Sequence, residues 1–197
     1  MKEFRADFTE SLVHLTRERT GPPLQDGKPD DDSEYSALDV LCEILSDGKL
    51  RGSTNSGFIK GNTPAVCFSE CPLSAIKLFA QKSDEENARY RFYGIAVSKN
   101  SAFSQGARPV IYLPDDEGDW IPSSEKWRHV RFEHGKVDWT FEREWRSKGD
   151  FDLGNTLGFY VVHWHTKERT RLESALRKDL RDKIRGYLPM LHLNQMF

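Results

Sequence analysis

The stretch Trp139–Arg146 reads Trp-Thr-Phe-Glu-Arg-Glu-Trp-Arg and alternates between aromatic or long side chains and polar ones. Because successive side chains of a strand point to opposite faces, this period of two predicts a β-strand. Glu142 and Glu144 then share one face, about 6–7 Å apart. Carboxylates this close raise one another's pKa, so the pair indicates a site that uses negative charge. The alternative is a solvated edge strand whose carboxylates pair with basic neighbours. These neighbours are Arg143, Arg146 and Lys148.

Composition describes a polar globular protein. The chain has 197 residues, of which 37% are hydrophobic and 30% charged, and its formal net charge is −2. This length can bury a core, and we expect residues 1–197 to form a single domain. No apolar run approaches the roughly 20 residues of a membrane span, and the charged start does not resemble a signal peptide. Three cysteines without a secretion signal favour free thiols, so we expect a cytoplasmic protein with no membrane association.

The other segments predict short strands and helices in irregular order. Strands are expected at residues 11–15, 65–69, 90–97, 109–113 and 157–164. Helices are expected at residues 36–48, 72–80, 99–105 and 167–185. Residues 20–34 are rich in Gly, Pro and Asp, which predicts a mobile acidic loop. Because the order lacks regular βαβ spacing, the sequence favours an α+β fold.

Several familiar site types are absent from the sequence. It contains neither a Gly-rich dinucleotide fingerprint nor a phosphate-binding Gly-Lys-Ser/Thr motif. Cys67 and Cys71 have no second pair at zinc-site spacing, so we expect no metal. His163 and His165 share a strand face, where they form half of a metal site or a hydrogen-bonded strand end. Cys67 lies in an apolar run, which is more typical of a small core residue than of a nucleophile.

Five short pieces occur in an order that is found in one family. They are His14–Thr16, Glu43–Leu50, Val66–Glu70, Gly106–Tyr112 and Glu142–Arg146. This order resembles that of the bacterial toxin-type ADP-ribosyltransferases, which include the DarT-like enzymes and related proteins of abortive-infection and phage-defence loci. The resemblance spans residues 10–165 and leaves out the acidic loop and the terminal helix. It implies an ADP-ribosyltransferase-like split β-sheet with a cleft for NAD.

The resemblance also implies catalytic residues. These enzymes cleave the bond between nicotinamide and ribose through a cation-like ribose, which a nearby carboxylate stabilises. Glu144 matches the catalytic glutamate, and Glu142 would orient the 2′-hydroxyl or activate the acceptor. His14 matches the histidine that holds the nicotinamide-side ribose; the alternative is a partly buried structural histidine. We expect Glu144→Gln to suppress turnover and to change the melting temperature little.

Further contacts with NAD are implied at positions that also have simpler structural explanations. Thr16 belongs to the first-strand piece of the resemblance. Ser69 would face the nicotinamide ribose, or it caps the helix that follows. Arg108 would hold the pyrophosphate, or it forms a surface ion pair. Tyr93 or Tyr112 would stack on nicotinamide, or both are core residues.

The acceptor of ADP-ribose is open. Lys and Arg outnumber Asp and Glu in residues 167–185, and a basic helix face can follow phosphates, which favours DNA or RNA as the acceptor. A solvated amphipathic helix gives the same pattern. Other functions are an NAD glycohydrolase, which uses water as acceptor, and a catalytically silent binding or immunity module. The toxin resemblance implies a partner, either an antitoxin or a regulatory protein.

Overall fold

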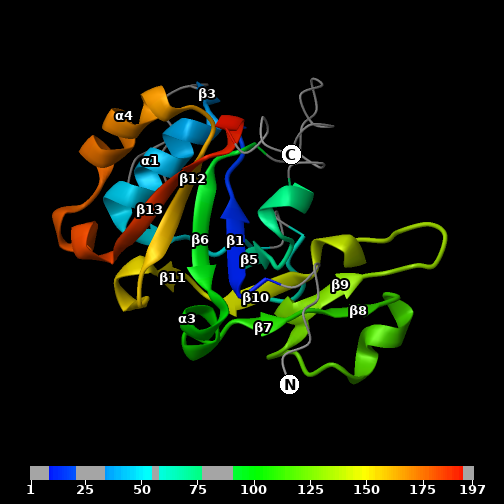
Figure 1. The fold of residues 1–197 in the computed structure, drawn as a ribbon. Coiled ribbons are helices and arrows are strands. Elements are labelled where there is room, and N and C mark those ends of the chain that lie inside the picture. Colours follow the sequence, from blue (N-terminus) through cyan, green and yellow to red (C-terminus); the bar gives the residue numbers. More distant parts are fainter. Residues whose placement is uncertain (1–8, 21–33, 55–57, 77–90, 193–197) are drawn as a thin grey trace, which may run out of the picture.

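The computed structural model describes residues 9–20, 34–54, 58–76 and 91–192. Its main element is a seven-stranded sheet of order β13-β12-β6-β1-β5-β10-β7 (Figure 1). The strands are β1 (Ser11–Leu15), β5 (Ala65–Ser69), β6 (Gly94–Ser98), β7 (Arg108–Pro109), β10 (Glu144–Lys148), β12 (Phe159–His163) and β13 (Ile184–Pro189). Neighbouring strands are antiparallel except β12 and β13, which are parallel. Mixed helices and a mostly antiparallel sheet confirm the α+β class.

Two core clusters cover the two faces of the sheet. On one face, α1 (Ala37–Asp47) and α4 (Arg169–Ala175) pack together, and Leu41 of α1 joins Leu12 of β1 in the larger cluster (Figure 1). On the other face, Val13 of β1 belongs to the smaller cluster. Adjacent residues of β1 therefore point to opposite faces, as a central strand requires. Both faces of β1 are buried, which fixes its register and the position of its side chains.

Helix α1 forms as its capping sequence predicts. The Ser36 hydroxyl accepts a hydrogen bond from the Asp39 backbone, and the Asp39 side chain accepts one from the Ser36 backbone. Gly48 ends the helix in the left-handed conformation, with φ of 72°. A Cβ at this glycine would also collide with the Arg177 side chain, 2.6 Å away.

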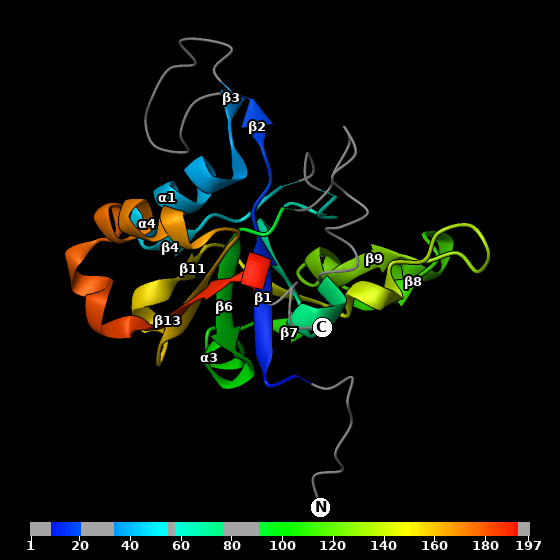
Figure 2. The same cartoon turned by 45° about the horizontal axis from the view of Figure 1, so that its top comes forward.

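A smaller lobe extends from the β7–β10 edge of the sheet, as Figure 2 shows for β8 and β9. It contains the parallel pair β8 (Ile111–Leu113) and β9 (His129–Arg131), with three 3₁₀ helices. These helices are η2 (Asp116–Trp120), η3 (Lys126–Arg128) and η4 (Thr140–Glu142). The remaining elements are β2 (Arg19–Thr20), β3 (Glu34–Tyr35), β4 (Lys49–Leu50), α3 (Lys99–Ser104), β11 (Phe151–Asp152), η5 (Leu153–Asn155), η6 (Thr166–Glu168) and η7 (Lys178–Lys183).

The prediction of one continuous strand over Trp139–Arg146 is wrong. Residues Thr140–Glu142 form η4, Arg143 has a left-handed backbone with φ of 45°, and the strand begins at Glu144. Contacts from a distant segment explain the difference. The Ser69 hydroxyl donates to the Glu142 carbonyl over 2.7 Å, and the Glu70 amide donates to the Arg143 carbonyl over 3.2 Å. Tertiary hydrogen bonds therefore override the local period of two.

The prediction of a long basic helix over residues 167–185 is also wrong. Only α4 is α-helical there, and η6, η7 and β13 make up most of the rest. The helix ends because the Arg177 amide bonds the Leu45 carbonyl, and because Ile184 joins the parallel pairing with β12. Leu172, Leu176, Leu180 and Ile184 form an apolar stripe at helical spacing in the sequence; the three leucines are buried, and Ile184 is partly buried. The stripe identified the core residues correctly but not the backbone conformation.

Most other boundaries lie close to those predicted. Residues 109–113 divide between β7 and β8, and the strand expected at 90–97 is β6, which begins at Gly94. Residues 73–76 form the described part of the helix after Pro72, and its continuation lies outside the described residues. The predicted acidic loop lies outside them at 21–33, while β2 and β3 pair at its base. No helix among the described residues is long and apolar enough to span a membrane.

Candidate functional site

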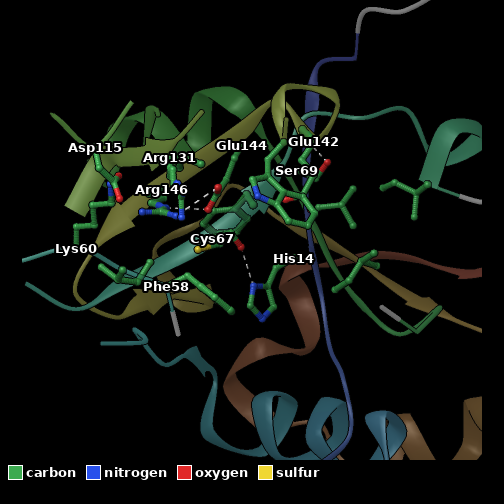
Figure 3. A pocket seen from close by; sticks show the side chains of 17 residues that line it. His14, Phe58, Lys60, Cys67, Ser69, Asp115, Arg131, Glu142, Glu144 and Arg146 are labelled. Carbon is green, nitrogen blue, oxygen red and sulfur yellow. Dashed lines mark hydrogen bonds and ion pairs between the residues drawn. The ribbon is translucent and has the colours of Figure 1, made fainter. Parts of the chain in front are cut away.

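A cavity of about 450 Å³ opens between the main sheet and the smaller lobe (Figure 3). Its walls come from β1, β5, β9, β10, the end of η4 and residues 58–60. Cavities of about 300–1,000 Å³ are typical of small-molecule sites. Four residues that the sequence predicts to contact NAD or to take part in catalysis line this cavity. They are His14, Ser69, Glu142 and Glu144.

Glu144 forms a buried ion pair with Arg146, which is two residues later on the same face of β10. Arg146 Nε donates to one carboxylate oxygen over 2.7 Å, and Nη2 donates to the other over 3.3 Å. Arg146 Nη1 also donates to the Trp127 carbonyl over 2.7 Å. Burial alone would lower the pKa of Arg146, but the Glu144 charge raises it above its usual value. The guanidinium is therefore charged, and it holds Glu144 in one orientation.

Cys67 lies on β5 opposite Arg146 and also lines the cavity. Burial raises the pKa of the Cys67 thiol far above its usual value, and the Glu144 charge adds to the shift. The thiolate is the nucleophilic form of cysteine, and it is suppressed here. Cys67 is therefore a neutral wall residue, as the apolar run around it predicted.

His14 is held by the backbone of the neighbouring strand. Its Nδ1 lies 2.8 Å from the Cys67 carbonyl, which can only accept a hydrogen bond, so Nδ1 bears the proton. Burial lowers the pKa of His14 from its usual value, and the hydrogen bond to Cys67 opposes this shift only in part. The ring is therefore neutral at pH 7. Its Nε2 has a free lone pair that can accept a hydrogen bond from a ligand hydroxyl.

The turn at Arg143 directs Glu142 toward the cavity. Ser69 fixes this turn through the Glu142 carbonyl, while its hydroxyl accepts a bond from the Cys71 amide over 3.1 Å. The Cys71 thiol donates to the Phe141 carbonyl over 2.7 Å. Backbone strain of this kind costs about 1–2 kcal/mol in a non-glycine residue and is frequent at functional sites. The Ser69 hydroxyl is thus engaged with protein groups on both sides.

Two predicted NAD contacts, Thr16 and Tyr93, do not line the cavity. The Thr16 hydroxyl donates to the carbonyls of Ala37 and Tyr93, over 2.8 and 3.1 Å. The Tyr93 hydroxyl donates to Glu168 over 2.8 Å, and burial together with that carboxylate raises the pKa of Tyr93. Both side chains link the sheet to neighbouring elements, which is the structural explanation for these residues.

The other two, Arg108 and Tyr112, also lie outside the cavity lining. Arg108 stacks on the Phe103 ring, with its Cζ 3.8 Å from the ring centroid, and donates to the Ala107 carbonyl. The Tyr112 hydroxyl accepts a bond from the Glu144 amide over 3.0 Å, and burial raises the pKa of Tyr112 to about 12. Tyr112 thus holds the backbone of Glu144 through this hydrogen bond. Contact of either residue with NAD stays a prediction.

Sequence reasoning missed the cavity residues that come from loops and from the lobe. None of them was named as a candidate ligand-binding residue; they are Phe58, Lys60, Asp115, Arg131 and Trp139. Lys60 forms an ion pair with Asp115, and its Nζ lies 3.3 and 3.4 Å from the two ring nitrogens of His129. The only local signal was the alternation of His129 and Arg131 along β9. No periodic pattern marks Lys60.

A metal centre is not found among the described residues, where no group of His, Cys, Asp and Glu has a suitable arrangement. His163 Nδ1 instead bonds the His165 carbonyl over 3.0 Å, which matches the hydrogen-bonded strand end. The cavity presents fixed carboxylates, a neutral histidine and cationic side chains, so it can bind a polar ligand with charges of both signs. Comparison with known proteins found no family model, no curated protein and no solved structure that matches this chain.

Proposed function

We propose that this protein is an NAD-dependent ADP-ribosyltransferase with the split-sheet fold of that class, acting as a cytoplasmic toxin or phage-defence effector. It would cleave the nicotinamide–ribose bond and transfer ADP-ribose to a macromolecule. One observation supports the proposal most strongly. Side chains that the resemblance assigns to catalysis, His14, Glu142 and Glu144, come from separate elements and line one cavity. The cleavage step needs these residue types together.

In this proposal Glu144 stabilises the ribose cation. Glu144 is buried, and a charge in a low-dielectric site acts more strongly than the same charge in water. Its partner Arg146 cancels part of that field, so the ion pair alone is formally neutral. Arg146 also holds this carboxylate in one orientation, so we assign cation stabilisation to Glu144, and orientation of the 2′-hydroxyl or activation of the acceptor to Glu142.

His14 holds the ribose in this proposal. Its neutral ring can accept a hydrogen bond from a ribose hydroxyl at Nε2, because Nδ1 is committed to the Cys67 carbonyl. A protonated ring would lose this acceptor and would place a positive charge beside the forming ribose cation. The lowered pKa of His14 favours the form that the reaction needs.

The acceptor is a macromolecule, with DNA or RNA favoured by the basic composition of residues 167–185. The support is weaker than the sequence suggested, because several of these arginines form ion pairs. The pairs are Arg169 with Glu173, Arg171 with Asp39, and Arg177 with Asp179. Water is the other acceptor, which would make the protein an NAD glycohydrolase. The neutralised Glu144–Arg146 pair favours a second candidate, a catalytically silent binding or immunity module.

Incubation with NAD labelled in the adenylate tests these functions. The reaction is run with DNA, RNA, cell lysate or buffer alone, and free nicotinamide and labelled macromolecule are measured separately. Label on a macromolecule is expected. Free ADP-ribose without label would indicate the glycohydrolase, and no nicotinamide release would leave the binding module. The chain should arrest growth when overproduced alone, and an antitoxin or regulatory partner should relieve this.

A further inference from the structure

The charges that line the cavity are unevenly distributed. Figure 3 shows Lys60, Asp115, Arg131 and Arg146 gathered at one end, with Glu142 and Ser69 at the other. We call this the cationic end because it gathers three basic side chains, although each is paired with a carboxylate: Lys60 with Asp115, Arg131 with Glu133 and Arg146 with Glu144. A ligand with separated charges would have its anionic part at this end.

Arg146 is already committed at the cationic end, whereas Lys60 can exchange its partner. The hydrogen bonds of Arg146 go to Glu144 and to buried backbone carbonyls. Lys60 pairs with Asp115, whose side chain is 56% exposed. An ion pair of this exposure contributes little net stability. The Lys60 bond lowers the pKa of Asp115, so that the carboxylate is ionised at neutral pH and competes with any other anion.

The lobe orients Lys60 and Arg131, the other two cations at this end. Lys60 Nζ lies within 3.4 Å of both His129 ring nitrogens, and His129 Nε2 is 3.1 Å from the Leu113 carbonyl. Arg131 is held by Glu133, with Nε donating over 2.7 Å. Arg131 is 51% exposed, and Glu133 holds it through Nε and Nη2 of the guanidinium, so a ligand can reach it from solvent. Guanidinium and ammonium groups held in this way suit phosphate oxygens.

We propose that Lys60 and Arg131 bind the diphosphate of a nucleotide and so orient it with its cationic ring toward Glu142. Asp115 stays paired with Lys60 until a phosphate displaces it. A diphosphate can do so because it offers more charge and more acceptor oxygens than one carboxylate. The identity of that nucleotide as NAD rests on the proposed function. The diphosphate site itself requires only the side chains at this end.

Binding of ADP and adenosine to the purified protein, measured by calorimetry, tests the diphosphate site. ADP should bind at least about tenfold more tightly than adenosine, as expected for charge-assisted hydrogen bonds. Lys60→Gln and Arg131→Gln should each weaken ADP about tenfold and leave adenosine unchanged. Asp115→Asn should tighten ADP. Lys178→Gln removes an equal charge from an exposed residue of η7 that does not line the cavity, and should change neither affinity.

Several results would overturn the proposal. They are equal binding of ADP and adenosine, no binding of ADP, and unchanged ADP affinity in both Lys60→Gln and Arg131→Gln. A single-stranded oligonucleotide could instead bind more tightly than ADP and lose affinity in the same two variants. That result would show that Lys60 and Arg131 bind a nucleic-acid polymer, and it would also overturn the proposal. Because ADP lacks the scissile bond, this test is independent of turnover. The expected ADP pattern without nicotinamide release would reject the proposed function alone.

Discussion

Arg146 holds both carboxylate oxygens of Glu144, at 2.7 and 3.3 Å, from two positions further along the same strand. The Arg146 and Glu144 side chains are 4% and 9% exposed. Two charges have thus been removed from water side by side, and neither can be neutralised without leaving the other buried. In the proposed enzyme, catalysis and folding are therefore coupled at this pair, which changes what a substitution there should do.

Glu144→Gln should lower both turnover and stability. Loss of the charge should reduce nicotinamide release by about 10²–10³ if Glu144 acts on the ribose. Breaking a buried ion pair costs about 3–5 kcal/mol, because Arg146 is left uncompensated. The expectation of an unchanged melting temperature, made from the sequence, ignored this arginine. Thermal unfolding and nicotinamide release, measured on the same preparation, check both effects.

The double variant Glu144→Gln/Arg146→Met separates the two losses. It should regain much of the stability, since neither buried charge remains, but not the turnover. Wild-type nicotinamide release from either variant would show that the wrong carboxylate has been assigned.

Glu142→Gln should reduce nicotinamide release less than it reduces labelling of the acceptor, if Glu142 also prepares the acceptor. Its carbonyl, which Ser69 holds, is unchanged by the substitution, so the turn should persist. The two products are assayed in parallel, with Ser69→Ala as a matched variant that loosens the turn and keeps the charge. Equal loss of both products in Glu142→Gln would contradict a separate acceptor role.

His14→Gln should remove part of the acid sensitivity of the fold. The unfolded chain binds a proton at this position near pH 6.5, whereas burial lowers the pKa of His14 in the folded protein. The unfolded state therefore binds more protons below about pH 6.5, and stability falls as the pH falls. The drop in melting temperature from about pH 7.5 to about pH 5.5 should be smaller in His14→Gln than in wild type. A variant of the exposed His134, His134→Gln, should keep the wild-type drop; identical drops in all three proteins would refute the assignment.

Arg143→Gly should be more stable than Arg143→Ala by about 1 kcal/mol, reversing the usual order of these residues. Both variants lose the same side chain, so their difference isolates the left-handed backbone with φ of 45°. Denaturant unfolding gives the two free energies. A more stable Arg143→Ala would mean that the turn relaxes without its side chain.

Local patterns in the sequence predicted the elements whose determinants are local. The capping box at Ser36 and the αL glycine Gly48 delimited α1, and short apolar runs located β1 and β5. The apolar stripe of residues 172–180 identified core residues correctly, because burial depends on spacing. It could not show where the helix ends, because that depends on bonds to Leu45 and on pairing with β12.

The same distinction between local and tertiary determinants applies to the residues of the candidate site. His14 and Glu144 were predicted because they lie on strands, where order along the chain is informative. Lys60 and Arg131 were not, because their shared cavity depends on how the lobe folds back over the sheet. Ser69 was named for a ligand contact, whereas its hydroxyl bonds the Glu142 carbonyl. No pattern within residues 65–70 can reveal a partner that lies in η4.

The pairing of β5 with β10 has a consequence for protein synthesis. Residues 69–71 fix the turn at Arg143, and β1 supplies the opposite wall of the cavity, so the pocket is built from early and late parts of the chain. On the ribosome, chains emerge from the N-terminus and fold progressively. A nascent chain whose β10 has not yet emerged from the ribosome has no complete pocket. Under the proposed function, a cell that makes this protein is therefore exposed to its activity only after most of the chain has been translated, and termination before β10 should yield an inactive product.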